Sequence, residues 1–272
     1  PVVNAAVIEQ VGKGTVFSQM NRLEVEVAEI LVDTIPCAEM VRFGKNGADA
    51  TAGAVRIARA VTGRDMIACC GYHGWHDWYI GTTTRDLGVP AAVKALTKTF
   101  VYNDIESLSK LFDAHPGQIA GVILEPVGVE PPKNRFLERV QDLCATHGTV
   151  LIFDEIVTGF RHALGGGQEL FGVVPDLACF GKAIANGFPL SAVVGKRSVM
   201  EVFDAVFVSG TFGGEAVSLA AAKATIAELK RRSAIPQIWS YGERLLGGIR
   251  ELVAANVLDN AIVAVGYPVR SV

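Results

Sequence analysis

A short apolar stretch interrupted by two acids constrains the fold of this chain most strongly. Residues 150–156 are apolar except for Asp154 and Glu155. A run this short, rich in branched and aromatic residues, is typical of a strand buried on both faces of a parallel sheet. Open α/β sheets bind ligands at the carboxyl ends of their strands, so we expect Asp154 to lie at a ligand-binding crevice.

A second stretch of the same kind ends in a lysine. Residues 176–182 read Asp-Leu-Ala-Cys-Phe-Gly-Lys, so one strand brings an acid to the crevice and the next brings the amine of Lys182. Pyridoxal 5'-phosphate (PLP) needs this pair, because a lysine holds its aldehyde as a Schiff base and an acid pairs with its pyridinium nitrogen. The pattern favours a PLP site with Lys182 and Asp154. The alternative is that Lys182 is an ordinary solvated loop lysine.

Composition indicates a globular protein and excludes several classes. Of the 272 residues, 50% are hydrophobic and 19% are charged, which is ample for a core. The net charge of −3 provides no basic surface for nucleic acid. No apolar run reaches the roughly 18 residues that a membrane span needs. The 5 cysteines show no C-x-x-C spacing, which fits a reducing compartment, so we expect a cytoplasmic protein.

A turn carrying asparagine and glycine opens into a helical pattern. Asn46, Gly47 and Ala48 precede an apolar face of helical spacing that extends to about residue 62. Free backbone N–H groups and the helix dipole at such a point can bind a phosphate. The alternative is an ordinary loop in which an Asn or Asp side chain caps the helix.

An aromatic and histidine-rich segment follows the next expected strand. Residues 66–70 form an apolar run, and residues 71–79 include Tyr72, His73 and His76. The segment could line a pocket for a flat ring, bind a metal, or simply pack as a loop. Two histidines without a fixed third ligand are weak evidence for a metal, so we predict no metal site.

The remaining pattern predicts an open α/β sheet with helices on both faces. About seven strands alternate with helices, and residues 165–167, three glycines, are expected to form a mobile loop. The expected strands are residues 41–44, 66–70, 100–102, 119–124, 150–156, 176–180 and 189–195, and the expected helices are residues 18–33, 50–62, 135–147, 215–230 and 237–256.

Taken in order, these motifs resemble the class III aminotransferases of PLP fold type I, and among them the glutamate-1-semialdehyde 2,1-aminomutase-like proteins. The resemblance covers nearly the whole chain. The motifs that carry it are residues 43–51, 71–74, 125–126, 153–161, 163–165, 168–169, 172–176, 180–182 and 210–213.

The resemblance implies a role for each residue around the cofactor ring. Lys182 matches the Schiff-base lysine, and Asp154 matches the acid on the pyridine nitrogen. Ile156 matches the branched residue on one face of the ring. Tyr72 matches the aromatic residue on the other face, with His73 beside it.

The resemblance also implies phosphate and substrate contacts. Asn46, Gly47 and Ala48 match the phosphate-binding turn, and Thr211 matches a threonine that reaches the phosphate from the neighbouring subunit of a homodimer. Glu125 matches an acid near the substrate. The family's turn usually reads Ser-Gly-Thr, so the hydroxyl is missing at Ala48 and phosphate binding must depend on backbone N–H groups and Thr211.

The expected protein is therefore a three-layer α/β enzyme with a mostly parallel sheet. Residues 1–256 would form a large PLP-binding domain, and residues 257–272 would begin a small carboxyl-terminal domain; both ends of the chain look cut. The expected activity is amino-group transfer on a small amino or keto substrate, either within one molecule or between two. The alternatives are a class III transaminase acting on an amino-sugar or ω-amino substrate and a non-catalytic α/β module. For a dinucleotide-binding module, the chain lacks a convincing G-x-G-x-x-G after its first strand.

Overall fold

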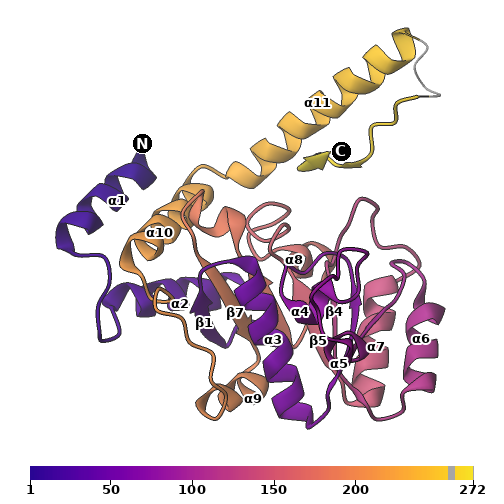
Figure 1. Cartoon of the computed structure of the whole chain (residues 1–272). Helices are drawn as coiled ribbons and strands as arrows, with labels where there is room; N and C mark the ends of the chain where they lie inside the picture. Colours follow the sequence, from indigo (N-terminus) through magenta and orange to yellow (C-terminus); the bar gives the residue numbers. More distant parts are fainter. Residues whose placement is uncertain (257–260, 272) are drawn as a thin grey trace.

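A seven-stranded mixed sheet organises the molecule (Figure 1). The computed structural model describes residues 1–256 and 261–271. The strand order is β1-β7-β6-β5-β4-β2-β3; β7 is antiparallel to both of its neighbours and every other pair is parallel. The mostly parallel sheet that the sequence predicts is therefore confirmed. The strands are β1 (Met40–Gly44), β2 (Met66–Cys70), β3 (Thr97–Thr99), β4 (Ile119–Leu124), β5 (Val150–Asp154), β6 (Leu177–Phe180) and β7 (Ser191–Gly195).

Helices cover both faces of this sheet, which gives the expected three layers. One core joins the sheet to α2, α6, α7 and α10, and a second core on the opposite face joins it to α3, α4 and α9. The helices are α1 (Val2–Lys13), α2 (Arg22–Thr34), α3 (Gly47–Thr62), α4 (Asp77–Ile80), α5 (Ala91–Ala95), α6 (Ile105–Ala114), α7 (Phe136–His147), α8 (Gly167–Phe171), α9 (Arg197–Met200), α10 (Ala216–Arg231) and α11 (Ala234–Ala255), with 3-10 turns η1 (Lys182–Ala185) and η2 (Glu201–Asp204).

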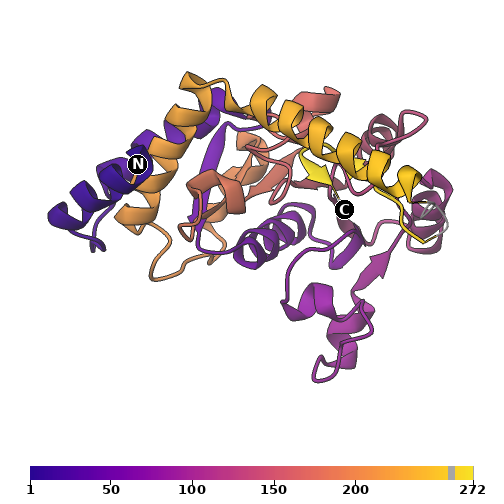
Figure 2. The same ribbon diagram turned by 90° about the horizontal axis from the view of Figure 1, so that it is seen from above.

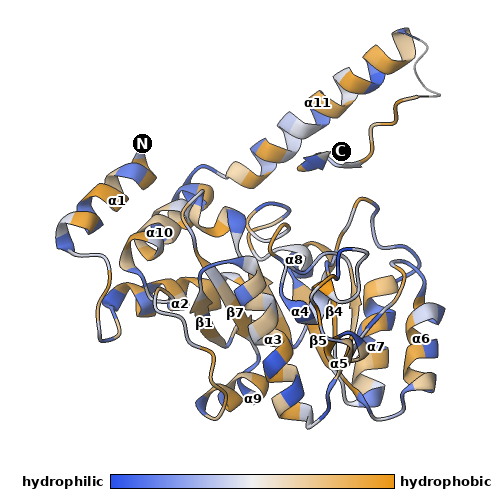
Figure 3. Ribbon diagram, viewed as in Figure 1, coloured by the Kyte–Doolittle hydropathy of each residue, from blue (hydrophilic) through white to orange (hydrophobic). Residues whose placement is uncertain are grey.

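The alternation of side chains along β5 decides where its terminal acid lies. Leu151 and Phe153 pack in the core beneath α2 and α7, whereas Val150 and Ile152 pack in the core beneath α3. Because successive side chains of a strand point to opposite faces, Asp154 projects on the α3 face. The strands carry mostly hydrophobic colours in Figure 3, as expected for a sheet buried on both faces.

Adjacent parallel strands bring Asp154 and Lys182 to one edge of the sheet. Strands β5 and β6 pair in parallel, with Asp154 opposite Cys179. Lys182 follows β6 by two residues and begins the 3-10 turn η1. The convergence that the sequence predicts thus follows from the order of the strands.

Two expectations of local structure are wrong. The expected strand at residues 100–102 lies instead at Thr97–Thr99, because the parallel ladder with β2 pairs Thr97 with Ile67 and Thr99 with Cys69. The expected mobile loop at residues 165–167 is held in place by a buried acid.

That acid is Glu155, which is fully buried. Its carboxylate accepts hydrogen bonds from the backbone N–H groups of Gly167 (2.7 Å) and Gln168 (2.9 Å) and from the Thr158 hydroxyl. Burial raises the pKa of Glu155 to about 7, while these hydrogen bonds act in the opposite direction. The two backbone donors, Gly167 and Gln168, tie the end of the glycine segment to the carboxyl end of β5.

The last described segments extend from the body of the molecule. Helix α11 projects away from the sheet in Figure 1 and lies along one side of the molecule in Figure 2. A short hairpin, β8 (Gly266–Tyr267) and β9 (Arg270–Ser271), returns to the sheet edge. The expected boundary at residue 257 lies outside the described residues, as do residues 258–260 and 272, so the division into two domains stays a prediction. Within the described part of the chain, none of the helices has the length and apolarity needed to cross a bilayer.

Candidate active site

A cavity of about 570 Å³ at the carboxyl edge of the sheet brings the predicted residues together. It contains every residue expected to contact a cofactor or substrate except Thr211, together with five others, of which only Arg270 lies outside the segments named in the sequence analysis. Its lining is Asn46, Gly47, Ala48, Thr51, Tyr72, His73, Gly74, Trp75, Glu125, Asp154, Ile156, Val157, Lys182 and Arg270.

A buried acid and histidine form one wall of this cavity. Asp154 Oδ2 lies 2.8 Å from His73 Nδ1, and both side chains are almost fully buried. His73 Nε2 lies 3.1 Å from the carbonyl oxygen of Cys70, and the N–H of Ile156 donates to Asp154 Oδ1 at 3.1 Å. These contacts hold the carboxylate in one orientation, which suits an acid that must meet a fixed ring atom.

Lys182 enters the cavity from the end of β6 in a backbone conformation that is rare for a lysine. Its φ is +43°, in the left-handed region that disfavours residues with a Cβ atom. Such strained residues concentrate at functional sites, because the surrounding structure must stabilise them. The Lys182 side chain is exposed to the cavity and has no hydrogen bond or ion pair within the described structure.

The turn before α3 carries a side-chain cap and also leaves backbone N–H groups unpaired within the described structure. Asn46 caps the helix: its side chain accepts from the N–H of Asp49 at 3.1 Å, and Asp49 accepts from the N–H of Asn46 at 3.0 Å. The N–H groups of Gly47 and Ala48 have no hydrogen-bond partner among the described residues. They are two of the unpaired donors at a helix N-terminus, where an anion is favoured.

Close packing leaves no room for larger residues around this turn. A Cβ atom at Gly47 would lie 3.2 Å from side-chain atoms of Ile156, and one at Gly181 would lie 3.0 Å from Ile156 Cδ1. Glycine at both positions therefore lets the backbone pack directly against the Ile156 side chain, which itself lines the cavity. The donors, the lysine and the acid fit PLP in chemistry.

Replacing Gly74 with alanine should destabilise the protein and disturb the phosphate turn. Gly74 has φ +99°, and an added Cβ would lie 2.7 Å from the Cβ of Ala48. Left-handed strain alone costs about 1–3 kcal/mol, and the contact adds to it. Gly88 is a matched control, because its φ is +93° and an added Cβ meets nothing within 4 Å. We expect urea unfolding to show a larger loss for Gly74→Ala than for Gly88→Ala; equal losses would contradict the packing described.

An ion pair forms part of the cavity wall. Arg270 Nη1 lies 2.8 Å from Glu125 Oε2, and the N–H of Tyr72 donates to Glu125 Oε1 at 3.2 Å. Glu125 therefore lines the cavity, and its expected place near the substrate stays a prediction. Arg270 was not predicted, because it is 145 residues away in sequence and only the terminal hairpin brings it here.

Several contacts hold that hairpin over the site. Arg161 Nε donates to the carbonyl oxygen of Val269, and Gly242 of α11 lies so close to Pro268 that a Cβ there would be 1.8 Å from the Pro268 carbonyl oxygen. The Tyr267 ring packs edge-to-face on His162, with ring centroids 5.4 Å apart. The only sequence signal for this arrangement was Arg161, which belongs to the conspicuous Thr-Gly-Phe-Arg motif.

His162 should make the protein sensitive to acid. It is 1% exposed, and burial, with Arg270 and Arg161 nearby, lowers its pKa from 6.5 to about 4. The unfolded chain then binds the proton more tightly than the folded one, so stability is lost as the pH falls from 6.5 to 4. We expect thermal unfolding of the wild type to lose roughly 2–3 kcal/mol more over this range than that of His162→Phe. Parallel pH profiles for the two proteins would contradict this account.

Thr211 lies away from the cavity in an exposed segment between η2 and α10. It does not line this chain's own site. Its position neither supplies nor excludes a contact with a second copy of the chain, so its expected role stays a prediction.

The comparison with known families settles which family the chain represents. The family described as aminotransferase class-III matches residues 1–262. The chain belongs to the class III aminotransferases. Its fold is that of a solved transaminase structure with PLP bound, which is 31% identical and superimposes with a TM-score of 0.93 over 98% of this chain and 67% of that one.

Curated relatives of this class III chain have different activities. It is 40% identical over 259 residues to the 3-aminobutyryl-CoA aminotransferase of Cloacimonas acidaminovorans, covering 92% of this chain and 62% of that protein. It is 36% identical over 281 residues to the glutamate-1-semialdehyde 2,1-aminomutase of Aquifex aeolicus, covering 96% of this chain and 66% of that protein. The chain thus spans slightly less than two thirds of the length of these relatives.

The histidine-rich segment of this aminotransferase chain contributes to the pocket wall. His73 pairs with Asp154, and Tyr72 and Trp75 line the cavity, while Trp78 is buried in the core. Among residues 1–256 and 261–271, no group of histidine, cysteine and acidic side chains is arranged to hold a metal ion. The sequence left three interpretations open for residues 71–79. The contacts favour two of them, a pocket lining that could accept a flat ring and ordinary loop packing.

Proposed function

We propose that this class III chain binds PLP and moves an amino group on a small amino or keto substrate, in the manner of a glutamate-1-semialdehyde 2,1-aminomutase-like enzyme. The observation that carries the proposal is one cavity lined by Lys182, Asp154 and the unpaired N–H groups of Gly47 and Ala48. When bound, PLP supplies an electron sink that makes a hydrogen on the substrate carbon acidic. In this proposal Lys182 would hold the aldehyde, Asp154 would pair with the ring nitrogen, and the two N–H groups would bind the phosphate.

Lys182 has two roles in this proposal. Its amine would hold the aldehyde of the cofactor. The ε-amine, when free, would also accept and return a proton at the substrate carbon. An arginine could not do this, because a guanidinium stays protonated. The absence of hydrogen-bond partners for Lys182 within the described structure leaves its amine free to move.

Asp154 keeps the ring nitrogen protonated, because a nearby negative charge favours the charged form of a base. Its contacts with His73 and with the N–H of Ile156 support this role by fixing the orientation of the carboxylate. Ile156 and Tyr72 would hold the two faces of the ring, and both side chains line the cavity.

The phosphate would bind at the start of α3. The N–H groups of Gly47 and Ala48 are its donors in this chain, and Asn46 keeps the turn in place as the helix cap. Ala48 offers no hydroxyl, so we propose that Thr211 of a second copy supplies one in a homodimer.

The five cysteines are free thiols in the structure, which supports a reducing compartment, and we place the protein in the cytoplasm.

An assay with and without an amino acceptor separates the candidate reactions. An aminomutase converts its substrate without an added 2-oxo acid, whereas a transaminase acting on another amino donor requires one. We expect the PLP-loaded protein to show turnover in one of these two formats across a panel of amino donors. No amino transfer in either format would favour the remaining candidate, a non-catalytic α/β module.

A further inference from the structure

The segment that carries Thr211 is exposed and irregular. Residues 205–215 connect η2 to α10 without forming a helix or strand, and they pass beside β1 and α3. Phe207 is 81% exposed and Phe212 is 53% exposed, so the segment has little apolar packing of its own. Something else must fix its backbone if Thr211 is to meet a defined partner.

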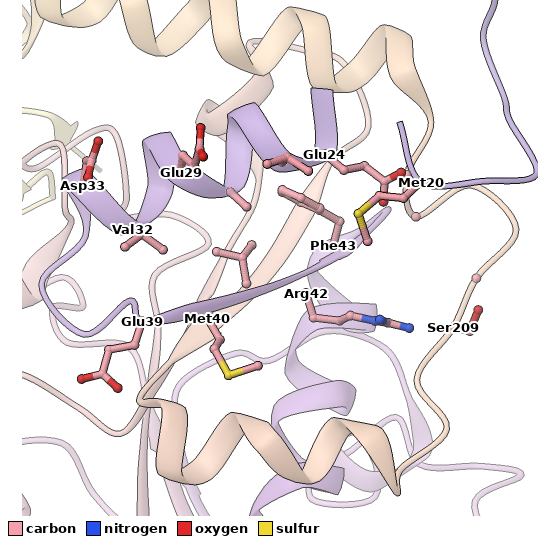
Figure 4. Close-up of a pocket in the computed structure, with 16 residues that line it drawn as sticks. Met20, Glu24, Glu29, Val32, Asp33, Glu39, Met40, Arg42, Phe43 and Ser209 are labelled. Carbon is pink, nitrogen blue, oxygen red and sulfur yellow. The ribbon is translucent and has the colours of Figure 1, made fainter. Parts of the chain in front are cut away.

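Two arginines from neighbouring elements supply that fixation. Arg42 of β1 donates from both Nε (3.2 Å) and Nη2 (2.9 Å) to the carbonyl oxygen of Val208. Arg56 of α3 donates from Nη1 to the carbonyl oxygen of Phe207 at 2.6 Å. Figure 4 shows Arg42 extending from β1 toward the segment that contains Ser209. Hydrogen bonds from a charged donor are roughly twice as strong as neutral ones.

Packing and an ion pair complete the arrangement. Val208 lies against Gly53 of α3, where an added Cβ would be 3.5 Å from Val208 Cγ1. At the far end of the segment, Lys45 pairs with Glu215 at 3.0 Å. Thr211 therefore lies between two fixed points, the arginine contacts at residues 207–208 and the ion pair at Glu215. Arg56 belongs to α3, the helix that begins with Gly47.

We propose that Arg42 and Arg56 are positioning residues that hold Thr211 in place for the cofactor phosphate of a second copy of this chain. The inference rests on the proposed function and extends it. Helix α3 would then serve two sites, because its first turn faces the phosphate in its own cavity and Arg56 fixes the segment that reaches the other.

Methionine variants test the proposal while retaining the packing of the side chains. Arg42→Met and Arg56→Met remove the donors, and Arg59→Met is the matched control. Arg59 is also on α3 and donates from Nε to a backbone carbonyl, that of Asp65, at 2.8 Å. Two measurements are made: hydrogen exchange of the amides at residues 207–212 in PLP-free protein, and the dissociation constant of PLP.

We expect both test variants to exchange these amides at least about tenfold faster than the wild type and to bind PLP roughly 5–30-fold more weakly, whereas Arg59→Met behaves as the wild type. Thr211→Ala should weaken PLP binding similarly, and combining it with Arg56→Met should add little, because both act through one contact.

Three results would overturn the inference. If Thr211→Ala weakens PLP binding but the arginine variants do not, the arginines do not position Thr211, and the proposed function stands. If Thr211→Ala binds PLP as the wild type does, the contact is wrong. If the wild type binds no PLP, the proposed function and this inference both fail.

Discussion

Lys182→Ala should fold normally and lose amino-transfer turnover by at least roughly 10²–10⁴-fold, the contribution of a positioned acid–base group. The loss has two causes, because the variant lacks both the amine that holds the cofactor aldehyde and the group that moves the proton. Folding should be unaffected, since the side chain is exposed to the cavity without a hydrogen-bond partner in the described structure and alanine retains the Cβ at the same φ of +43°. Steady-state rates and urea unfolding measure the two properties separately.

Lys98→Ala is the control for this variant. Lys98 is on β3 and lines a different cavity, with Arg64 and His115. It should keep wild-type turnover. Turnover within tenfold of the wild type for Lys182→Ala would remove the lysine from the proposed chemistry.

Asp154→Asn should yield a folded but nearly inactive protein. A neutral amide cannot favour a protonated ring nitrogen, and breaking a buried charge pair costs about 3–5 kcal/mol. If the whole of this free energy is lost from transition-state stabilisation, turnover falls by roughly 10²–10³-fold or more. The asparagine oxygen can still accept a hydrogen bond from His73, so the wall of the cavity should persist.

Asp176→Asn provides the comparison, because Asp176 is also an acid of this sheet but lies outside the cavity. It pairs with Lys196 at 2.7 Å and accepts from the N–H of Leu151 at 2.9 Å. We expect that variant to lose some stability and to keep its turnover. Near-normal turnover in Asp154→Asn, with PLP bound, would count against the role assigned to the acid.

The strands and the meeting of Asp154 with Lys182 could be predicted because both depend on local pattern and parallel order. Continuous apolar runs specified β4 and β5, and parallel neighbours place their carboxyl ends together. The capping asparagine also followed from the turn, although the sequence alone could not show that this cap leaves the N–H groups of Gly47 and Ala48 unpaired in the described part of the chain.

The rest depended on contacts between distant residues. Arg270 donates a hydrogen bond to Glu125, which is 145 residues away in sequence, from a hairpin that no local sequence pattern predicts. Three consecutive glycines at 165–167 predict a mobile loop, but the buried Glu155 accepts hydrogen bonds from the N–H groups of Gly167 and its neighbour Gln168. The strand expected at residues 100–102 begins three residues after β3, because the apolar side chains there predict a strand, whereas pairing with β2 determines its actual position.

Borohydride treatment of the PLP-loaded protein, followed by mass analysis of its peptides, tests the central claim most directly. Reduction makes the lysine–cofactor bond permanent, so the modified peptide identifies the lysine involved. We predict that the cofactor mass is found on the peptide containing Lys182 and is absent from Lys182→Ala. A cofactor mass on another lysine, or on none, would contradict the assignment of this cavity as the PLP site.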